Sequence, residues 1–309
     1  MSILSTEERA RIIAQLVEGT GIRGTARLCG ANKTTVNKLS LELGKGCLAL
    51  HNELVRDVRV ALVQVDEQWS FVKKKQKRMK PTDDPETTGD QWTYLAQDVT
   101  TRVVLSFLVG RRTSASAREF VTDLRGRVLG RFQVTADGHK PYVDAFLEIC
   151  GDTVDFAQLV KRYECDEREA KGLPLGRKWY IGSEKTAITG NPNPKHTSTS
   201  RIERTNLSNR MEQARFARKT LRHSKDITHH RASAALYYAY YNLCRVHQTL
   251  RTTPAVVLGI TPREWSLGEL IEVAMDHRPR ASAKVEVEAL DAAIAPVVLR
   301  VLAGGKGRP

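Results

Sequence analysis

The sequence changes from a helical to an extended pattern at Val60-Ala61-Leu62-Val63-Gln64-Val65-Asp66. The β-branched and aliphatic side chains of this run predict a strand that closes on Asp66. Helices are expected near Ser200 and at residues 114–128 and 141–150. Strands in series, alternating later with single helices, predict an α/β fold in which a mixed sheet carries helices on both faces. The further runs of strand length are residues 69–72, 92–96, 103–109, 131–135 and 154–160.

Changes of composition divide the chain into four segments. Residues 1–48 have the pattern of three short helices, and residues 49–59 that of a linker. Residues 60–265 hold the predicted sheet, interrupted by a polar loop insertion rich in Gly and Pro at 161–199. Residues 266–309 form a C-terminal tail of Ala, Val and charged residues. The chain is therefore expected to carry an all-α N-terminal domain before a larger α/β domain.

The N-terminal helices have the spacing of a helix-turn-helix. Ser5 and Glu8 form a capping box before the first helix, and Gly30 can take the positive φ of the tight turn before the third. In such a unit, the outer face of the last helix enters the major groove of DNA. A small helical bundle with a solvated polar face is the alternative. The candidate DNA-binding residues on the last helix are Asn32, Lys33, Thr34, Thr35, Asn37 and Lys38.

The 309 residues include 49 basic and 35 acidic side chains, a formal charge of +14. This excess predicts a polyanionic partner, and nucleic acid is the commonest one. With 41% hydrophobic and 27% charged residues, the composition excludes pervasive disorder and fibrous proteins. The longest apolar run, at 103–109, is too short to span a membrane, and the charged N-terminus is unlike a secretion signal. Five cysteines without a close pair favour reduced thiols, so a cytoplasmic protein is expected.

Three acidic residues flank the predicted core elements. Asp66 closes the first strand, Asp137 directly follows the strand at 131–135, and Glu203 lies in the first turn of the helix near Ser200. A carboxylate near a core needs a partner such as a metal ion, because an unpaired buried charge is costly. Three carboxylates make a hard oxygen site for two Mg²⁺ or Mn²⁺ ions, which suits phosphodiester displacement.

Each of these acids also has a purely structural explanation. Asp137-Gly138 is a favoured turn pair. Glu203 matches a capping box with Ser200. Either Asp66 or Glu67 could be a surface charge at a strand end. The residues alone leave both readings open for each acid.

Three segments, in this order, carry a family resemblance: Val65-Asp66-Glu67-Gln68-Trp69-Ser70-Phe71, Thr135-Ala136-Asp137-Gly138-His139, and Ile202-Glu203-Arg204-Thr205-Asn206-Leu207 through Arg210. A later group is similar to a pattern common after the glutamate of the same family: Tyr241-Asn242, Arg245, His247, Leu250 and Pro254. Over about residues 60–265, the chain resembles the DDE transposases of bacterial insertion sequences. It is closest to the insertion-sequence-one type.

The resemblance implies a ribonuclease H-like catalytic domain in which Asp66, Asp137 and Glu203 are catalytic and hold two divalent metal ions. It implies an enzyme that cuts the ends of an insertion sequence and joins the freed 3′ hydroxyl to target DNA. Arg210 matches a basic residue that contacts DNA near the cut. Two element ends must be brought together, so a homodimer or larger assembly on the DNA of the bacterial nucleoid is expected. Some relatives carry an N-terminal zinc finger; this chain lacks paired cysteines, which leaves terminal recognition to the helix-turn-helix.

The basic run at residues 73–80 begins a connection that is expected to lie close to Asp66. Lys73, Lys74 and Lys75 are further candidates for contacts with the DNA backbone, although such a run is ordinarily a solvated loop. Two other functions stay open. One is a sequence-specific DNA-binding protein whose catalytic centre has decayed, and the other is a nuclease that cuts without joining.

Overall fold

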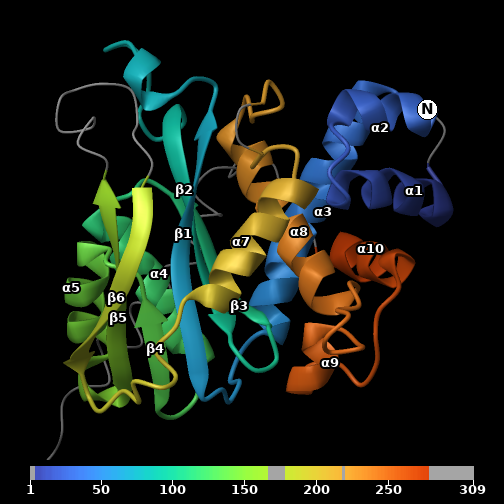
Figure 1. Ribbon diagram of the computed structural model, residues 1–309. Helices are drawn as coiled ribbons and strands as arrows, with labels where there is room; N and C mark the ends of the chain where they lie inside the picture. Colours follow the sequence, from blue (N-terminus) through green and yellow to red (C-terminus); the bar gives the residue numbers. More distant parts are fainter. Residues whose placement is uncertain (1–3, 166–177, 218–219, 278–309) are drawn as a thin grey trace, which may run out of the picture.

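The computed structural model describes residues 4–165, 178–217 and 220–277 (Figure 1). Its strands are β1 (Leu62–Val72), β2 (Gly89–Asp98), β3 (Val104–Gly110), β4 (Phe132–Ala136), β5 (Val154–Cys165) and β6 (Lys178–Thr189). Its α-helices are α1 (Thr6–Val17), α2 (Ile22–Leu28), α3 (Lys33–Leu54), α4 (Ser114–Arg127), α5 (Lys140–Ile149), α7 (Ser200–Glu212), α8 (Ile227–Leu243), α9 (Pro254–Leu258) and α10 (Leu267–Asp276).

The strands form one mixed sheet in the order β3-β2-β1-β4-β5-β6. β2 is antiparallel to both β1 and β3, whereas β1, β4 and β5 run parallel, and β6 returns antiparallel to β5. α5 makes the crossover that the parallel neighbours β4 and β5 require. The predicted α/β class is confirmed: a mixed sheet is flanked by helices, and its strand order is consistent with a ribonuclease H-like fold.

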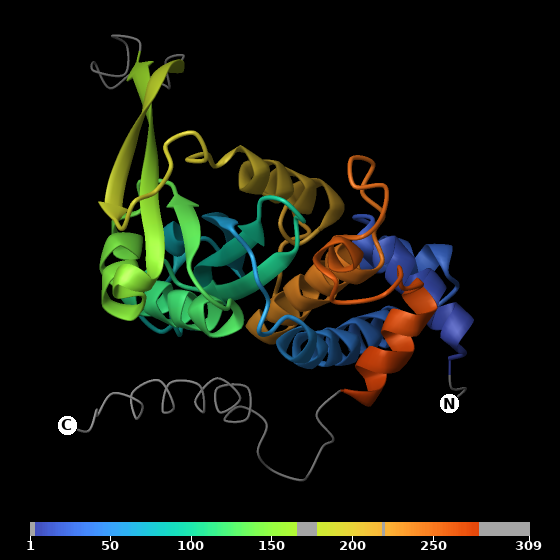
Figure 2. The ribbon, with the colours of Figure 1, turned by 90° about the horizontal axis from the view of Figure 1, so that it is seen from below.

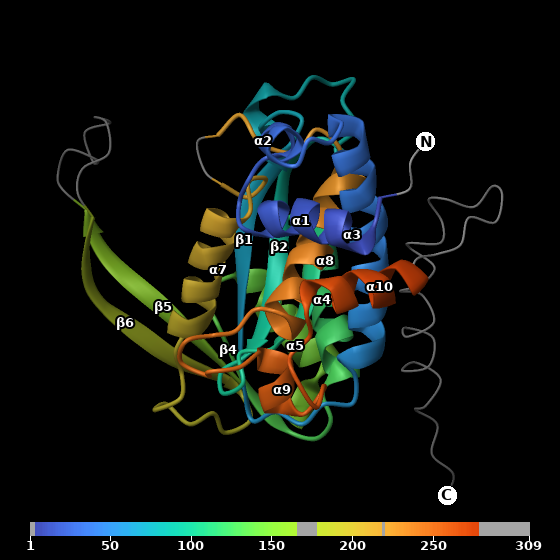
Figure 3. The ribbon, with the colours of Figure 1, turned by 90° about the vertical axis from the view of Figure 1, so that its right-hand side faces the viewer.

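Helices cover both faces of the sheet, and alternation along β1 assigns each side chain to one face. Val63 and Val65 are buried in the same core as side chains of α4 and α5. Asp66 points the other way, together with its antiparallel partner Leu95, which belongs to the core under α7 and α8. Figure 3 shows α7 and α4 on opposite sides of β1. The central strand therefore presents Asp66 to the α7 side.

β1 is longer than predicted. Residues 69–72, expected as a separate strand, are its second half and continue the pairing with β2. Gln68 and Ser70 break the apolar pattern, but both are buried and hydrogen-bonded within the protein. The prediction that Asp66 closes a strand was therefore wrong, because Asp66 lies in the middle of β1.

The predicted loop insertion at 161–199 was wrong for most of its described length. β5 continues to Cys165, and β6 returns from Lys178 to Thr189 as its antiparallel partner. The outer part of this hairpin extends past the helices that cover the rest of the sheet (Figure 2). Polar residues therefore follow one another in these strands, because no buried face imposes an apolar alternation on them.

The ends of the predicted N- and C-terminal segments also differ from expectation. α3 is one helix that continues through most of the predicted linker at 49–59. Ser266 and Glu269 form a capping box at the start of α10, inside the predicted tail at 266–309. Residues 278–309 of that tail lie outside the described residues.

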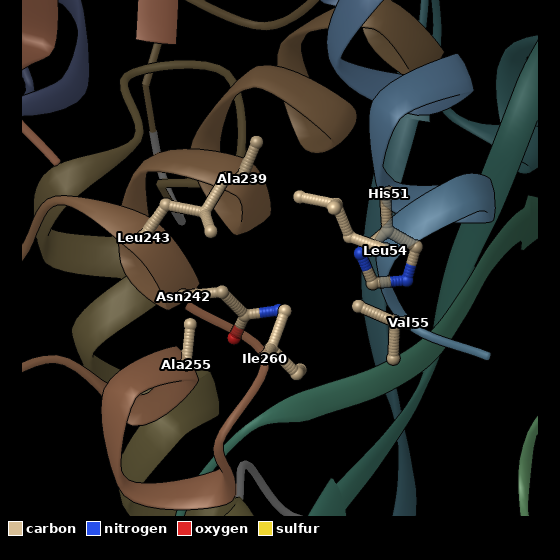
Figure 4. A pocket seen from close by; sticks show the side chains of 8 residues that line it. All are labelled: His51, Leu54, Val55, Ala239, Asn242, Leu243, Ala255 and Ile260. Atoms are coloured by element: carbon tan, nitrogen blue, oxygen red, sulfur yellow. The ribbon is translucent and has the colours of Figure 1, made fainter. Parts of the chain in front are cut away.

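α1, α3, α8 and α10 share one hydrophobic core. Leu43 and Leu50 of α3 are buried in it with Leu236 of α8 and Leu270 of α10. Gly44 permits this contact, because a Cβ atom there would lie 2.2 Å from a backbone oxygen of α8. Figure 4 shows a small gap in this packing, lined by His51, Leu54, Val55, Ala239, Asn242, Leu243, Ala255 and Ile260. The N-terminal helices are thus packed onto helices that follow the sheet.

The sequence predicts reduced cysteines and no membrane-spanning helix. The described cysteine side chains, Cys29, Cys47, Cys150 and Cys244, are free thiols. Burial raises the pKa of Cys150 to about 12, which keeps this thiol protonated. Among the helices within residues 4–277 that the structure describes, none combines the length and the apolar character that crossing a membrane requires.

Candidate active site

Asp66 faces α7 from the middle of β1. Its Oδ2 accepts a hydrogen bond from Asn206 Nδ2 on α7 at 2.7 Å, and its Oδ1 accepts one from the backbone N–H of Glu67 at 2.9 Å. These two donors fix the orientation of the carboxylate. Sequence reasoning did not single out Asn206, although its spacing of three residues from Glu203 places both on one face of the helix.

Asp137 directly follows β4 and lies beside Asp66. The parallel register aligns Gln64 with Thr135, so the residues two positions further on, Asp66 and Asp137, come to the same level of the sheet. Each offers a carboxylate oxygen, and these oxygens lie within 4.8 Å of each other. The structure therefore brings together two of the three predicted acids.

Glu203 lies in the first turn of α7 but outside this close group. Its Oε1 accepts a hydrogen bond from Thr199 Oγ1 at 2.6 Å, and its Oε2 accepts one from Lys161 Nζ of β5 at 2.6 Å. The capping box with Ser200, the structural alternative for Glu203, is absent from this described helix start. Instead, Gln64 Oε1 of β1 accepts two of the first-turn N–H groups, those of Arg201 and Ile202, at 3.0 Å.

The electrostatics of the site are those of crowded carboxylates. Burial raises the pKa of Asp66 to about 6, and the charges of Asp137 and Glu203 add to the rise. Partial burial alone would lower the pKa of Lys161, but the Glu203 carboxylate outweighs it and the pKa is raised. Lys161 is thus a protonated cation placed among acids, a role that its position in the predicted loop did not reveal.

Glu67 is a buried acid behind Asp66, on the α4 and α5 face, and not the surface charge that the sequence allowed. Its side chain is 1% exposed, and Oε1 accepts a hydrogen bond from Arg112 Nε at 2.8 Å. His139 Nδ1 lies 3.7 Å from the same oxygen, and the backbone N–H of His139 donates to Asp137 Oδ1 at 3.0 Å. Burial and the nearby Asp137 raise the pKa of Glu67 to about 7. This network connects the buried Glu67 to the Asp137 turn.

The donor set fits a divalent metal ion. Asp66, Glu67 and Asp137 offer oxygens within 4.8 Å of one another, and carboxylate oxygen is the ligand that Mg²⁺ and Mn²⁺ prefer. The Oε2 of Glu67 is buried without a hydrogen-bond partner in the described protein. Burial, and then the charge of Asp137, raise the pKa of Asp66, so a nearby positive charge would favour its ionised form. A cation bound by Asp66 and Asp137 would supply that charge, and Glu203 lies in the first turn of α7, near enough for its own charge to act on Asp66.

The predicted recognition residues lie at the start of α3. Asn32 accepts a hydrogen bond from the N–H of Thr34 at 2.9 Å and so begins the helix. Asn37 is half-buried, and its side chain contacts Arg215 at 3.4 Å and His229 at 3.4 Å. Gly30 has the expected positive φ of 63°. The exposed members of the set are Asn32, Lys33, Thr34, Thr35 and Lys38.

The basic run at 73–80 lies farther from Asp66 than predicted. Because β1 continues to Val72, about 23 Å of strand separates Asp66 from Lys73. Lys74 is paired with Asp83 at 2.8 Å, and Lys75 lies over the rings of Trp69 and Phe71. Lys73 is the exposed member without such a described pairing of its side chain.

The same basic run is joined to the N-terminal helices by residues 220–226. The N–H of Lys73 donates to the carbonyl oxygen of Ser224 at 2.8 Å, and Arg222 Nη1 donates to that of Gly19 at 2.9 Å. Arg210, seven residues after Glu203 on α7, is half-buried. Through residues 220–226, the basic run is thus connected to the turn between α1 and α2.

No family model and no curated protein matches the sequence. Among solved structures, the chain is similar to a pre-cleavage Mos1 transpososome, with 15% identity over 50% of this chain and a TM-score of 0.19. The Mos1 mariner paired end complex with Mn has 16% identity over 50% of this chain and a TM-score of 0.19. The chain covers 60% of either protein.

The Mos1 strand transfer complex is similar over 76% of this chain and 78% of that chain, with 13% identity and a TM-score of 0.20. The fold of this chain is described by its own strand order, and the site by the contacts of Asp66, Glu67 and Asp137.

Proposed function

We propose that this chain is a transposase of the bacterial insertion-sequence type. It cuts the ends of an element and joins the freed 3′ hydroxyl to target DNA by phosphodiester displacement. The observation that carries this proposal is the meeting of the Asp66 and Asp137 carboxylates within 4.8 Å, on the face of the sheet where the first turn of α7 supplies Glu203. The reaction type comes from the resemblance of these three segments to the DDE transposases.

Asp66, Asp137 and Glu203 are the residues that would hold two Mg²⁺ or Mn²⁺ ions, which when bound activate the attacking oxygen and stabilise the leaving oxygen. Asn206 and the N–H of Glu67 orient the Asp66 carboxylate. Lys161 neutralises Glu203 and keeps it turned toward β5. Arg210, two turns after Glu203, contacts DNA near the cut.

DNA binding is proposed for two connected parts of the surface. The start of α3 recognises the element ends, with Lys33 and Lys38 exposed for phosphate contacts. The run at 73–80 binds the DNA backbone, and residues 220–226 join it to α1 and α2. The formal charge of +14 favours such a polyanionic partner. Two copies or more act together on the DNA of the bacterial nucleoid, in the cytoplasm.

Strand cleavage and joining test this function directly. An oligonucleotide that carries the element end is incubated with Mg²⁺ and the wild-type chain, or with Asp66→Asn, Asp137→Asn or Glu203→Gln. Each variant is expected to bind the DNA but to lose cleavage and joining. Asp144→Asn is the matched control, because Asp144 is an exposed acid on α5.

The outcomes also separate the alternatives. Cleavage without joined products would assign a nuclease, and binding without cleavage by the wild type would assign a DNA-binding protein. Full activity of Asp66→Asn would refute the catalytic role of that carboxylate.

A further inference from the structure

The outer half of the β5–β6 hairpin carries exposed aromatic side chains. Tyr163, Tyr180 and Trp179 are 51%, 59% and 49% exposed. Tyr163 and Tyr180 are cross-strand neighbours whose ring centroids lie 6.1 Å apart. Figures 2 and 3 show this hairpin reaching beyond the helix layers. Clustered aromatic rings on such an exposed element are typical of an interaction site.

The tyrosine pair lies on the same face of the sheet as the candidate active site. Phe156 of β5 is buried in the core with α4 and α5. The pairing with β6 shifts register directly after Phe156 and again between Arg162 and Tyr163, and β6 holds the extra residue at both places. The alternation along β5 therefore continues, and every second residue from position 157 onward faces the α7 side. Lys161 agrees with this assignment, because its ammonium contacts Glu203 of α7. Tyr163 follows Lys161 on this face, and Asp66 of β1 points the same way.

The charges of the hairpin differ between its two faces. The α7 side carries Lys161 together with Lys185, whose register partner is Leu159 on the same face. Glu164 and Glu184 lie on the other face, opposite Trp179 and Val160 in the register. Within the described side chains of the outer hairpin, the tyrosine face therefore carries no acid. Of its two cations, Lys161 is paired with Glu203 of α7, and Lys185 is exposed. Aromatic rings interleaved with cations are typical of surfaces that bind single-stranded nucleic acid.

The net charge of the chain decides between two possible occupants of this face. In the absence of DNA, two copies that each carry a formal charge of +14 repel each other, whereas a DNA strand is attracted to either of them. Bases inside a duplex already stack on their neighbours, so an exposed ring offers a stacking partner to an unpaired base. The tyrosine face is thus complementary to a single-stranded segment of DNA.

We propose that Tyr163 and Tyr180 stack an unpaired base of the DNA strand that is bound at the Asp66 and Asp137 site. This inference depends on the proposed function in taking DNA as the substrate. Ala136 of β4 pairs with Gln158 of β5 in the parallel register, so the next residues, Asp137 and Leu159, lie at the same level of the sheet. The four residues from Leu159 to Tyr163 span about 13 Å, the length of about four nucleotides of one B-form strand. The stacked base therefore lies about four nucleotides from the cleaved phosphate.

A binding experiment with paired variants tests this site. The affinity for a duplex with a short single-stranded extension is compared with that for the blunt duplex, by fluorescence anisotropy without divalent metal ions. Tyr163→Leu with Tyr180→Leu keeps an apolar cross-strand pair but removes the aromatic faces. Tyr163→Phe with Tyr180→Phe keeps the rings, and Trp179→Leu changes the opposite face of the same hairpin.

We expect the double Leu variant to bind the extended duplex about tenfold more weakly than the wild type. Its affinity for the blunt duplex is expected to stay at the wild-type level. The double Phe variant and Trp179→Leu should bind both the extended and the blunt duplex as tightly as the wild type does. 2-Aminopurine at the fourth unpaired nucleotide should lose its fluorescence on binding to the wild type, and keep it with the double Leu variant.

Equal affinity of the double Leu variant and the wild type for the extended duplex would overturn the stacking site alone. Failure of the wild type to bind either DNA would overturn the proposed function together with this inference. Light scattering tests whether the tyrosine pair is instead a contact with a second copy of the chain. The wild type could be a dimer and the double Leu variant a monomer, with equal affinities for DNA. In that case the tyrosine pair is a contact between copies, and the proposal is wrong.

Discussion

Two adjacent carboxylates of β1 meet different surroundings. Asp66 receives hydrogen bonds from Asn206 and from the N–H of Glu67, and it shares its face with α7. Glu67 is enclosed on the other face and is paired with Arg112, whose guanidinium also lies over the ring of Trp92. Burial is the main reason why the pKa of both acids is raised. Both acids offer an oxygen to the close acidic group, and Glu67 also connects Arg112 to the turn that carries Asp137.

Removal of Arg112 is expected to destabilise the protein in a pH-dependent manner. The folded pKa of Glu67, about 7, is above its ordinary value of 4.5, so the cost of the buried charge builds up between these two pH values, is complete above pH 7 and is absent below pH 4.5. Arg112→Ala should lower the free energy of unfolding by about 3 kcal/mol at pH 8 and by less at pH 5. Urea unfolding at both pH values measures this. With Glu67→Gln as a second substitution, the pH dependence should vanish; a pH-independent loss in Arg112→Ala alone would contradict the account.

Metal binding is expected to weaken in acid. A metal ion needs the ionised carboxylate of Asp66, and the pKa of about 6 means that protons compete for it below pH 6. The affinity for Mn²⁺, measured by electron paramagnetic resonance, should fall about tenfold per pH unit below that value, since one proton is displaced per ion. A constant affinity between pH 7 and pH 5 would show that Asp66 does not bind the ion.

For single residues, the sequence indicates a candidate site residue where that residue lies next to a strong local pattern, such as an apolar strand. Asp66 and Asp137 are predicted site residues because each adjoins an apolar, β-branched run, and the structure brings their carboxylates close together. Lys161 and Arg112 were missed because their partners, Glu203 and Glu67, are 42 and 45 residues away in the chain. No local pattern records such a contact.

Among the elements, α7 is positioned by the strand that carries Asp66. Gln64 Oε1 accepts the N–H groups of Arg201 and Ile202, and Asn209 Nδ2 donates to Gln68 Oε1 at 2.6 Å. The helix that carries Glu203 is thus attached to β1 by side chains two residues on either side of Asp66. This attachment fixes the distance between the helix and the acids.

Gln64→Ala should therefore loosen the start of α7. It leaves two N–H groups without their partner, at a cost of about 1–3 kcal/mol in the free energy of unfolding. Strand cleavage should fall as well, because Glu203 lies in the same turn. Gln64→Glu keeps an acceptor, and it should be more stable than Gln64→Ala at pH 4, where the added carboxyl group is largely protonated and adds no buried charge. Thermal unfolding and cleavage of both variants check this; wild-type cleavage by Gln64→Ala would contradict it.

Element prediction succeeded where burial imposes a pattern and failed where it does not. β3 and α4 lie within one or two residues of their expected bounds. The β5–β6 hairpin was missed because its outer strands have no buried face, so polar and aromatic residues follow one another. β1 was divided in two because Gln68 and Ser70, although buried, satisfy their hydrogen bonds inside the protein.

In the molecule as a whole, the N-terminal helices and the helices after the sheet form one packed body. Leu43 of α3, Leu236 of α8 and Leu270 of α10 belong to the same core. The sequence indicates separate segments here because each helix is amphipathic by itself, and nothing local tells which apolar faces meet. Deletion of residues 1–48 should therefore expose the apolar face of α8 and α10.

We expect the chain without residues 1–48 to aggregate or to lose cooperative thermal unfolding. Leu43→Asp, which buries a charge in the shared core, should destabilise the full-length chain strongly, whereas Lys38→Asp on the exposed side of α3 should not. Light scattering and thermal unfolding measure both effects. A monomeric, cooperatively unfolding chain without residues 1–48 would show an independent N-terminal domain instead.

The central claim is that Asp66, Asp137 and Glu203 bind divalent metal ions together, and Mn²⁺ binding measured by electron paramagnetic resonance tests it most directly. The wild type and Asp144→Asn should bind Mn²⁺ equally at pH 8. Asp66→Asn, Asp137→Asn and Glu203→Gln should each bind it far more weakly while keeping the wild-type unfolding temperature or a higher one. Equal Mn²⁺ binding by all five proteins would contradict the account.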